Sequence, residues 1–452
     1  MNPSRIDTNE NDLPWSNRPF AELLRLAWPI AVSMLSFSAM SLVDTLFVGR
    51  ISAAAIAGVG LASLLIFTLA CFGIGMARSV KTLVAQAVGG GRAESSTRFL
   101  GAGLALALAT STVAIALGGL VLWALPALAG DPEAAREGGA YFEVRLWSIP
   151  LLLLYSATRE YSYGRGNSRA PMVASLVANG ANALLDYLLI IEVDLGAAGA
   201  AWASLIAGLL ELGFVWYAIG PRFRSLRPSR RHIAELWRLG LPTGLQFVIE
   251  VGSFTLTGLI IAGISKLEMA GHQIALHALH LSFLPAHAIG EAGAVLAGQA
   301  IGAGRLGLIP RVARSTLLTA TVYTSACTLA VLLLADRFGY WFTDDLRVAS
   351  IAGVLLLFSA SFQIVDGAAI VAGSLLRGIG DVRFVAYVSV IVAWACTPTG
   401  TYLLGVRAGL GALGAWIGIT AELAVIAALF WWRLAGGRWQ GAALSTRKAA
   451  TE

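Results

Sequence analysis

Apolar runs long enough to cross a bilayer recur along the whole chain, and they constrain its fold more than any other feature. Most of them exceed the roughly 20 residues that a membrane-spanning helix needs. Only 13% of the 452 residues are charged, whereas about a quarter are charged in an ordinary soluble domain. We therefore predict an all-α polytopic protein of the lipid bilayer with twelve transmembrane helices. The predicted spans are residues 22–48, 53–80, 96–126, 140–163, 170–192, 197–219, 236–264, 268–299, 310–335, 348–375, 384–405 and 410–434.

The basic residues between these spans predict the orientation. With both termini in the cytoplasm, only seven of the 32 Lys and Arg residues fall on the outer side, which is the positive-inside pattern. Those seven are Arg50, Arg136, Arg145, Lys266, Arg337, Arg347 and Arg407. We interpret the basic run over residues 222–231 as a topology signal, in preference to a site for anionic lipids. Topology thus explains the net charge of +6 without nucleic acid as a partner, and we expect a multi-pass protein of a bacterial-type inner (cytoplasmic) membrane.

The two halves of the chain resemble each other. Residues 21–29 (AELLRLAWP) return 213 residues later as residues 234–242 (AELWRLGLP), and residues 86–92 (QAVGGGR) return as residues 299–305 (QAIGAGR). Parallel repeats of six spans are typical of transporters, with the substrate site near the interface between the repeats. The predicted segments are a cytoplasmic tail (1–20), an N-lobe (21–220), a basic linker (221–235), a C-lobe (236–435) and a second cytoplasmic tail (436–452).

Four carboxylates inside the predicted spans are singled out as candidates for function, and none of them is duplicated in the other half. They are Asp44, Asp186, Glu250 and Asp366, and their repeat equivalents are Thr257, Gly400, Phe37 and Leu152. A carboxylate in hydrocarbon is costly, so it usually faces a polar cavity and serves a function there. Our working hypothesis is that Asp44 binds and releases a cation.

The fifth predicted span carries a stripe of polar residues on one of its faces. Asn179, Asn182 and Asp186 stand at positions i, i+3 and i+7 and so share one helix face. Their oxygen atoms suit a small hard cation. Hydrogen bonds between helices explain the two asparagines equally well, whereas we interpret Asp186 as functional.

The second half carries polar stripes of its own. Gln246 and Glu250 share a face of the seventh predicted span, and Gln363 and Asp366 share a face of the tenth. Each stripe alone is explained by a structural hydrogen-bond network. Two acids in separate spans of one half favour a second polar site, for a cation or a substrate.

Two further features of the spans concern protons and movement. His277 and His280 share a face of the eighth span, where histidines can relay protons near neutral pH or form polar contacts between helices. Pro29, near the start of the first span, removes a backbone hydrogen bond and permits bending. Because Pro242 occupies the equivalent position, architecture is the default interpretation of Pro29 and a hinge is the second.

Five short motifs are spread along the chain. They are Val43-Asp44-Thr45, residues 86–92, Asn182-Ala183-Leu184-Leu185-Asp186, Gly271-His272-Gln273 and Leu376-Arg377-Gly378-Ile379-Gly380-Asp381. Together they resemble the multidrug and toxic compound extrusion (MATE) transporters, over about residues 20–435. The resemblance implies twelve helices in two lobes that form a V-shaped cleft. It also implies export of cationic amphipathic compounds in exchange for inward Na+ or H+.

By this resemblance, the N-lobe site matches the DinF-like branch of the family. Asp44, Asn182 and Asp186 stand at the positions of that branch's cation site, and Ser204 stands where it often has a hydroxyl. The resemblance therefore makes Na+ a candidate ion at Asp44, Asn182 and Asp186. Because this match is the fuller one, the DinF-like branch is favoured over the NorM-like branch.

The C-lobe resembles the NorM-like branch with one departure. Glu250 and Asp366 match the acids of that branch, but Phe362 replaces the tyrosine that NorM-like proteins often carry one turn before the last acid. A Na+ site in the C-lobe would lose that oxygen.

Taken together, the sequence predicts a secondary-active multidrug efflux antiporter that works by alternating access. We favour H+ over Na+ as the coupling ion and expect a monomer with no cofactor and no catalytic residues. A flippase or an exporter of a lipid-linked or specific metabolite is the alternative, although it would prefer a large cavity lined by cations. A membrane-embedded enzyme and a channel are further alternatives.

Overall fold

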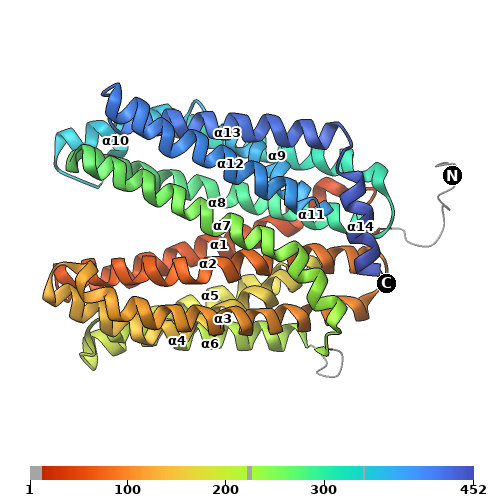
Figure 1. Cartoon of the computed structure of the whole chain (residues 1–452), viewed down its shortest axis with the longest axis horizontal. Coiled ribbons are helices and arrows are strands. Elements are labelled where there is room, and N and C mark those ends of the chain that lie inside the picture. The colour runs from red at the N-terminus through yellow and green to blue at the C-terminus, as the bar shows by residue number, and fades with distance from the viewer. Residues whose placement is uncertain (1–12, 221–225, 340–341, 452) are drawn as a thin grey trace.

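The computed structural model describes residues 13–220, 226–339 and 342–451, and the regular elements in these ranges are all helices. Figure 1 shows them as two packed bundles of long, roughly parallel helices. The helices of the first half are α1 (Pro19–Val48), α2 (Ala53–Gly89), α3 (Ala93–Ala129), α4 (Pro132–Gly164), α5 (Arg169–Asp186), η1 (Tyr187–Glu192) and α6 (Gly196–Ile219). Those of the second half are α7 (Arg230–Ile264), α8 (Lys266–Gly302), η3 (Leu306–Leu308), α9 (Ile309–Phe338), α10 (Leu346–Ser359), α11 (Gln363–Ile379), α12 (Val382–Gly400), η5 (Thr401–Arg407), α13 (Ala412–Ala435) and α14 (Gln440–Thr451).

The helices account for the twelve predicted spans. Ten of them are long and apolar enough to cross a membrane, and the bent pair α10 and α11 makes an eleventh. The remaining predicted span corresponds to α4, which carries several acids and arginines, including Glu143, Arg145, Arg159 and Glu160. It packs inside the first bundle against α2, α3 and α6. Because of these charges, α4 is less apolar than the other spans, although it packs among them.

The tenth predicted span is broken, which the sequence analysis did not anticipate. α10 and α11 meet at an angle of 57° around residues 360–362. The hydroxyl of Ser359 donates to the carbonyl oxygen of Leu356 (2.6 Å), and that of Ser361 donates to the carbonyl oxygen of Phe358 (2.7 Å). Serines that bond to carbonyls of the preceding turn compete with the helix ladder and bend it. The break places Asp366 in the first turn of α11.

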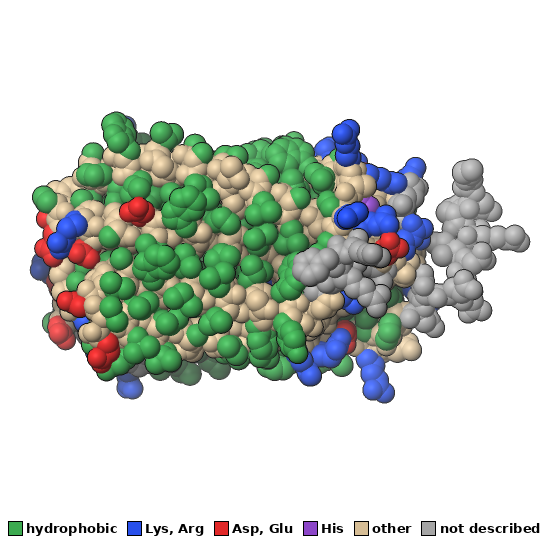
Figure 2. Space-filling model, turned by 90° about the horizontal axis from the view of Figure 1, so that it is seen from below, with side chains coloured by type: hydrophobic (Ala, Val, Ile, Leu, Met, Phe, Trp, Pro, Cys, Tyr) green, Lys and Arg blue, Asp and Glu red, His purple; other side chains and the backbone are tan. Residues whose placement is uncertain are grey.

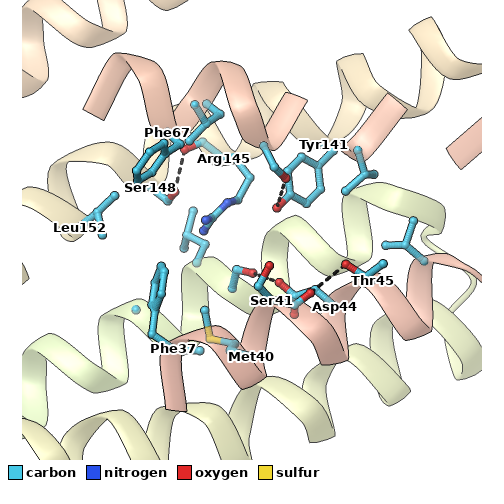
Figure 3. Close-up of a pocket in the computed structure, with 18 of the residues that line it drawn as sticks. Phe37, Met40, Ser41, Asp44, Thr45, Phe67, Tyr141, Arg145, Ser148 and Leu152 are labelled. Atoms are coloured by element: carbon cyan, nitrogen blue, oxygen red, sulfur yellow. Dashed lines mark hydrogen bonds between the residues drawn. The ribbon is translucent and has the colours of Figure 1, made fainter. Parts of the chain in front are cut away.

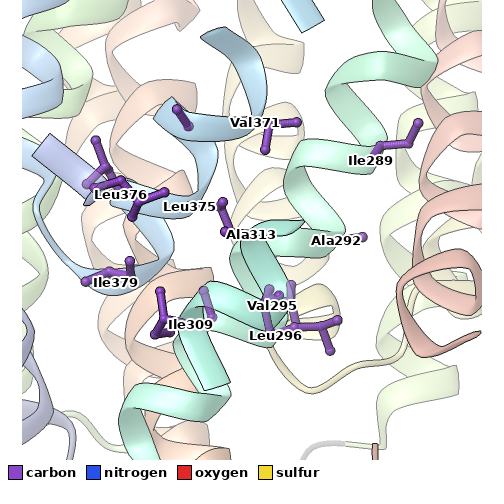
Figure 4. Close-up of a cluster of buried hydrophobic side chains, with 14 of the residues drawn as sticks. Ile289, Ala292, Val295, Leu296, Ile309, Ala313, Val371, Leu375, Leu376 and Ile379 are labelled. Atoms are coloured by element: carbon purple, nitrogen blue, oxygen red, sulfur yellow. The ribbon is translucent and has the colours of Figure 1, made fainter. Parts of the chain in front are cut away.

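Two helix bundles form the body of the molecule, and the helices α1 and α7 each contact both bundles. α2 to α6 pack together, as do α8 to α13, while α1 packs on both α5 and α8, and α7 packs on both α2 and α12. The second bundle has a core of interlocking aliphatic side chains from α8, α9 and α11 (Figure 4), including Ile289, Leu296, Val371 and Leu375. The structure therefore confirms the two-lobe architecture.

The surface is that of a membrane protein. Figure 2 shows hydrophobic side chains over the middle of the molecule and charged groups at its two ends, with Lys and Arg gathered at the end where the termini lie. An apolar belt between polar ends matches the hydrocarbon core of a bilayer and its two headgroup regions.

At the end that carries the termini, a pair of glutamines joins the lobes. Gln86 of α2 donates to the carbonyl oxygens of Gly378 (3.2 Å) and Ile379 (3.1 Å), while Gln299 of α8 donates to that of Gly164 (3.5 Å). The two glutamines are repeat equivalents, and each bonds the opposite lobe. Trp15 strengthens one side, because its indole nitrogen donates to Gln299 Oε1 at 2.7 Å. We call this arrangement the glutamine clasp.

The clasp depends on close approach of α2 and α8. A Cβ atom on Gly89 would overlap with the carbonyl oxygen of Gln299, and one on Gly302 would overlap with that of Gln86. Only glycine, which has no Cβ, lets two helix backbones come this near.

Replacing Gly89 by alanine is therefore expected to open the clasp. Overpacking costs about 1–3 kcal/mol, so the closed arrangement should lose population by about fivefold or more. A cysteine placed at Thr82, which is buried beside the clasp and donates to the carbonyl oxygen of Arg377, would report the opening through its rate of maleimide labelling. Gly60→Ala on the same helix is the matched control, because a Cβ there meets nothing within 4 Å. Equal labelling rates in both variants would contradict the role of the clasp.

The structure describes part of each predicted tail. Leu13 and Trp15 are buried before α1, while residues 1–12 lie outside the described part of the chain, as do residues 221–225 of the basic linker. Within the segment predicted as a C-terminal tail, residues 440–451 form α14, which packs on α2, α3, α8 and α11. Its Thr446 donates to the carbonyl oxygen of Ile379 at 3.2 Å, next to the glutamine clasp.

Candidate functional site

A cavity of about 470 Å3 lies in the N-lobe between α1, α2, α4 and α6 (Figure 3). Asp44 of α1 lines this cavity and is half-buried. Much of the wall is apolar and comes from Phe37, Met40, Phe67 and Leu152. An apolar hollow of this size with a few charged groups is the usual form of a small-molecule site. We call it the N-lobe cavity.

Three polar side chains from two other helices converge on Asp44. The amide nitrogen of Asn182 donates to Asp44 Oδ1 at 2.6 Å and to Asp186 Oδ2 at 2.8 Å. The hydroxyl of Ser204 on α6 donates to Asp44 Oδ2 at 3.2 Å. One amide group thus holds two carboxylates, and Asn182, Asp186 and Ser204 are all buried.

The same cluster leaves oxygen atoms without donors. Asp186 Oδ1 and Asn182 Oδ1 are buried and have no hydrogen-bond partner. Two carboxylates that share one amide in a buried site repel each other, and unmatched buried oxygens are costly. A proton or a cation bound here would relieve both costs. The donor set of carboxylate, amide and hydroxyl oxygens fits a hard cation such as Na+. Within the described part of the chain, no three His, Cys, Asp or Glu side chains gather as metal ligands.

The local sequence explains how these groups meet. Asn182 and Asp186 are one turn apart on α5, so both face α1. Further along the same contact, the hydroxyl of Ser175 donates to that of Ser33 at 3.2 Å. Asn179 donates to both the carbonyl oxygen and the hydroxyl of Ser36. The polar face of α5 is therefore bonded to α1 along its length.

This arrangement divides the five residues predicted for the N-lobe site. Asp44, Asn182, Asp186 and Ser204 lie together as one hydrogen-bonded cluster. Asn179 instead bonds to Ser36 and ties α5 to α1, which matches the alternative of a bond between helices. Pro29 is buried within α1, which continues through it from Pro19 to Val48, so its role as a hinge stays a prediction.

Two further charged residues line the N-lobe cavity, and the sequence analysis missed both. Arg145 of α4 reaches into the cavity from the wall opposite α1 (Figure 3). Glu211 of α6 also lines the cavity and has Arg159 as a charged neighbour. Arg145 was expected on the outer side as part of the charge asymmetry, but it is half-buried and its Nε atom is fully enclosed.

The residues predicted for the second lobe do not form one cluster. Gln246 donates to Glu250 along α7 at 2.9 Å. Gln363 donates weakly to Ser359 and accepts from Thr328, both at 3.4 Å. Within the described chain, no hydrogen bond or ion pair joins these two groups.

A carboxylate on α13, which the sequence analysis did not single out, lies near the two predicted acids. Glu422 is buried, accepts a hydrogen bond from Thr397, and has Glu250 and Asp366 as charged neighbours. These three acids, Glu250, Asp366 and Glu422, come from α7, α11 and α13. His277 and His280 are exposed on α8, and His280 lies beside the ring of Phe283.

A buried charge cluster crosses the interface between the lobes. Lys81 of α2 pairs with Glu160 of α4 at 3.4 Å and with Glu291 of α8. Arg159 adds a bond to Glu160 at 3.2 Å, and His287 lies 3.6 Å from Glu291. The side chains of Lys81, Glu160 and Glu291 are at most 7% exposed. We call these residues the interlobe charge cluster.

The sequence contained a signal for this cluster that the span boundaries hid. The second predicted span ended at residue 80, directly before Lys81, whereas α2 continues to Gly89. A lysine within a membrane helix is costly unless it is paired. Extending the span by one turn would have marked Lys81 as a residue that needs carboxylate partners.

Comparisons with known proteins place the chain in a family. The MatE family model matches residues 29–188 and 242–403, so the two matches begin 213 residues apart, which is the offset of the internal repeat. The probable multidrug resistance protein NorM of Pseudomonas syringae pv. tomato is 31% identical over 432 residues, covering 89% of this chain and 91% of that protein. The protein of the same description from Burkholderia mallei is 33% identical over 444 residues, covering 93% of both chains.

Solved structures share the fold. The chain is similar to a eukaryotic MATE transporter with a TM-score of 0.88 at 18% identity, covering 96% of this chain and all of that one. A MOP superfamily transporter from Pyrococcus furiosus gives a TM-score of 0.87 at 18% identity, with the same coverage. Because the MatE model covers most of the chain and curated relatives exceed 30% identity along nearly its full length, the chain belongs to the MatE family and is a transporter of the multidrug and toxic compound extrusion type, not an enzyme.

Proposed function

We propose that this transporter exports cationic amphipathic compounds and takes up H+ or Na+ in exchange. The single observation that carries the proposal is the double role of Asp44. Its side chain lines a largely apolar cavity, and it shares the amide of Asn182 with the buried Asp186. One carboxylate is therefore available both to a substrate in the cavity and to an ion in the cluster.

The cavity suits the chemistry of such substrates. Phe37, Met40 and Phe67 supply apolar and polarisable contacts, which adapt to ligands of varied shape. Asp44 and Glu211 supply negative charge to a cationic group. The curated relatives carry the description "multidrug resistance protein", which supports a range of substrates rather than one metabolite.

Coupling follows from competition for the negative charge of the cluster. An ion bound to Asp44 and Asp186 neutralises the group that a cationic substrate needs, so the two ligands favour different states of the protein. A ligand shifts a conformational equilibrium only through such a difference in affinity. The ion would then enter from outside as the substrate leaves.

We favour H+ over Na+ as the coupling ion. In the C-lobe, Phe362 is buried at the break before α11 and offers no oxygen to a cation near Asp366. In the N-lobe, the unpartnered carboxylate oxygen of Asp186 would accept a proton directly. We further propose that the protein works as a monomer in an inner membrane with both termini in the cytoplasm, since Lys and Arg gather at the end where the termini lie (Figure 2).

The flippase alternative is less well supported. A cavity of about 470 Å3 falls in the range of drug-sized ligands, and among its charged lining residues Asp44 and Glu211 are acidic.

Purified protein in liposomes, with a fluorescent organic cation supplied in the external medium, tests the proposal. With the termini-bearing end facing outward, an imposed proton gradient and an imposed Na+ gradient are applied in separate experiments. We expect the proton gradient alone to drive uphill movement of the dye. Movement driven only by Na+ would overturn the choice of ion, and movement that runs only downhill under both gradients would overturn the antiport proposal.

A further inference from the structure

The N-lobe cavity holds a positive charge that cation export does not require. Arg145 extends from α4 into the cavity, facing the wall formed by α1 (Figure 3). Its Nε atom is buried and has no hydrogen-bond partner. The guanidinium carbon of Arg145 lies 6.0 Å from the ring centroid of Tyr141 on the same helix, which is a cation–π contact.

Two other enclosed cations have carboxylate partners, whereas Arg377, whose Nε is also buried without a hydrogen-bond partner, has no ion pair among the described residues. Lys81 pairs with Glu160 and Glu291, and Arg433 bonds to Asp381 at 2.7 Å. Within the described residues, no carboxylate forms an ion pair with Arg145. A partly buried guanidinium that lacks its anion has paid much of the desolvation cost and has unused donors. This is the expected state of a binding group whose partner is supplied by the ligand.

The guanidinium and the carboxylate cluster stand on different walls of one cavity. Asp44 belongs to α1 and Arg145 to α4, and apolar side chains such as Phe37 and Phe67 line the same cavity to one side of these polar groups. A ligand that fills this space can therefore meet a negative group and a positive group at once. The planar fork of arginine binds a carboxylate through two parallel hydrogen bonds.

We propose that Arg145 binds a carboxylate on the substrate, so that the cavity binds zwitterionic amphipathic compounds more tightly than their esters. The substrate's cationic group would face Asp44 and its carboxylate would face Arg145, with an apolar body between them. The inference rests on the proposed function, because it assumes that the N-lobe cavity is where the exported compound binds.

A matched pair of dyes tests this selectivity. Rhodamine 110 is a zwitterion with a free carboxylate, and rhodamine 123 is its methyl ester, so the two differ only in the group that Arg145 would read. Binding of each dye to purified protein is measured by fluorescence polarisation in the wild type, in Arg145→Gln, and in Arg145→Lys. Arg136→Gln on the same helix is the control, because Arg136 has a side chain that is 74% exposed and pairs with Glu137.

We expect Arg145→Gln to weaken binding of rhodamine 110 by about tenfold or more and to leave binding of rhodamine 123 unchanged. The unchanged affinity for the ester shows that the cavity is intact. Arg145→Lys should fall between the wild type and Arg145→Gln, since it keeps the charge and loses the fork. Arg136→Gln should behave as the wild type.

Two results would overturn the inference, and they are distinguishable. If Arg145→Gln weakens both dyes equally, or neither, Arg145 does not read the carboxylate, while the proposed function stands. If neither dye binds the wild-type protein, the cavity is not the substrate site and the proposed function falls with the inference.

Discussion

Replacing Asp44 by asparagine is expected to abolish ion-driven export while leaving the protein folded and inserted. Asparagine has nearly the same shape, so the contact with α5 and α6 can be kept. It carries no charge, however, and so it can neither exchange a proton or cation nor attract a cationic substrate. Loss of a coupling energy at the upper end of its usual range corresponds to about 100-fold. We therefore expect uphill dye transport in liposomes to fall by about 100-fold.

Matched variants distinguish this effect from a general loss of folding or transport activity. Asp344→Asn is the control, because Asp344 is exposed between α9 and α10 and should leave transport unchanged. Asp186→Asn should be nearly as damaging as Asp44→Asn, since both acids share Asn182. Asp366→Asn asks whether the C-lobe acids take part. Normal uphill export by Asp44→Asn would show that the ion site lies elsewhere.

Replacing Lys81 by methionine is expected to cost more stability than any other single change in the interlobe charge cluster. The variant leaves Glu160 and Glu291 as buried carboxylates without their shared cation. Removing one partner of a buried ion pair typically costs about 3–5 kcal/mol. The lobes should therefore separate or unfold more readily. When detergent-solubilised protein is heated stepwise, the variant should lose its signal of folded protein at a lower temperature than the wild type.

A double variant and a surface control complete this test. Lys81→Met with Glu291→Gln removes one orphaned charge and should recover part of the lost stability. Lys266→Met changes an exposed lysine at the start of α8 and should have little effect. If Lys81→Met melts like the wild type, the cluster does not hold the lobes together.

Much of the fold could be predicted from the sequence, because a membrane leaves few choices. Backbone groups in hydrocarbon must bond within the chain, so each long apolar run becomes a helix. The repeat placed Gln86 and Gln299 as equivalent residues, and they form the two sides of the glutamine clasp. The break at Ser359 and Ser361 could not be read from hydropathy, because it arises from local bonds to the backbone.

The candidate site was predicted in part. Asp44, Asn182, Asp186 and Ser204 were named in advance and lie together. An intramembrane carboxylate is a strong signal, and spacing placed Asn182 and Asp186 on one helix face. The resemblance to the MATE family grouped these two residues with Asp44 and Ser204. The branch preference between DinF-like and NorM-like proteins stays a prediction, although the curated relatives are described as NorM proteins.

Cations were harder to place than acids. Arg145 and Lys81 lie near the ends of predicted spans, where basic residues normally serve as topology signals. Their true surroundings depend on how α2, α4 and α8 pack against one another, which helix periodicity alone does not specify. The identity of the carboxylate partners of Lys81, and the position of Arg145 in the cavity wall, therefore became visible only in three dimensions.

The most direct test of the account measures the ion that leaves the protein when substrate binds. Purified transporter in weak buffer is mixed with a saturating organic cation, while a proton electrode and a Na+ electrode record the solution. The account predicts that wild-type protein releases a proton, or Na+ if that is the coupling ion, and that Asp44→Asn releases neither. Equal release from wild type and Asp44→Asn would contradict the claim that Asp44 is the residue at which ion and substrate compete.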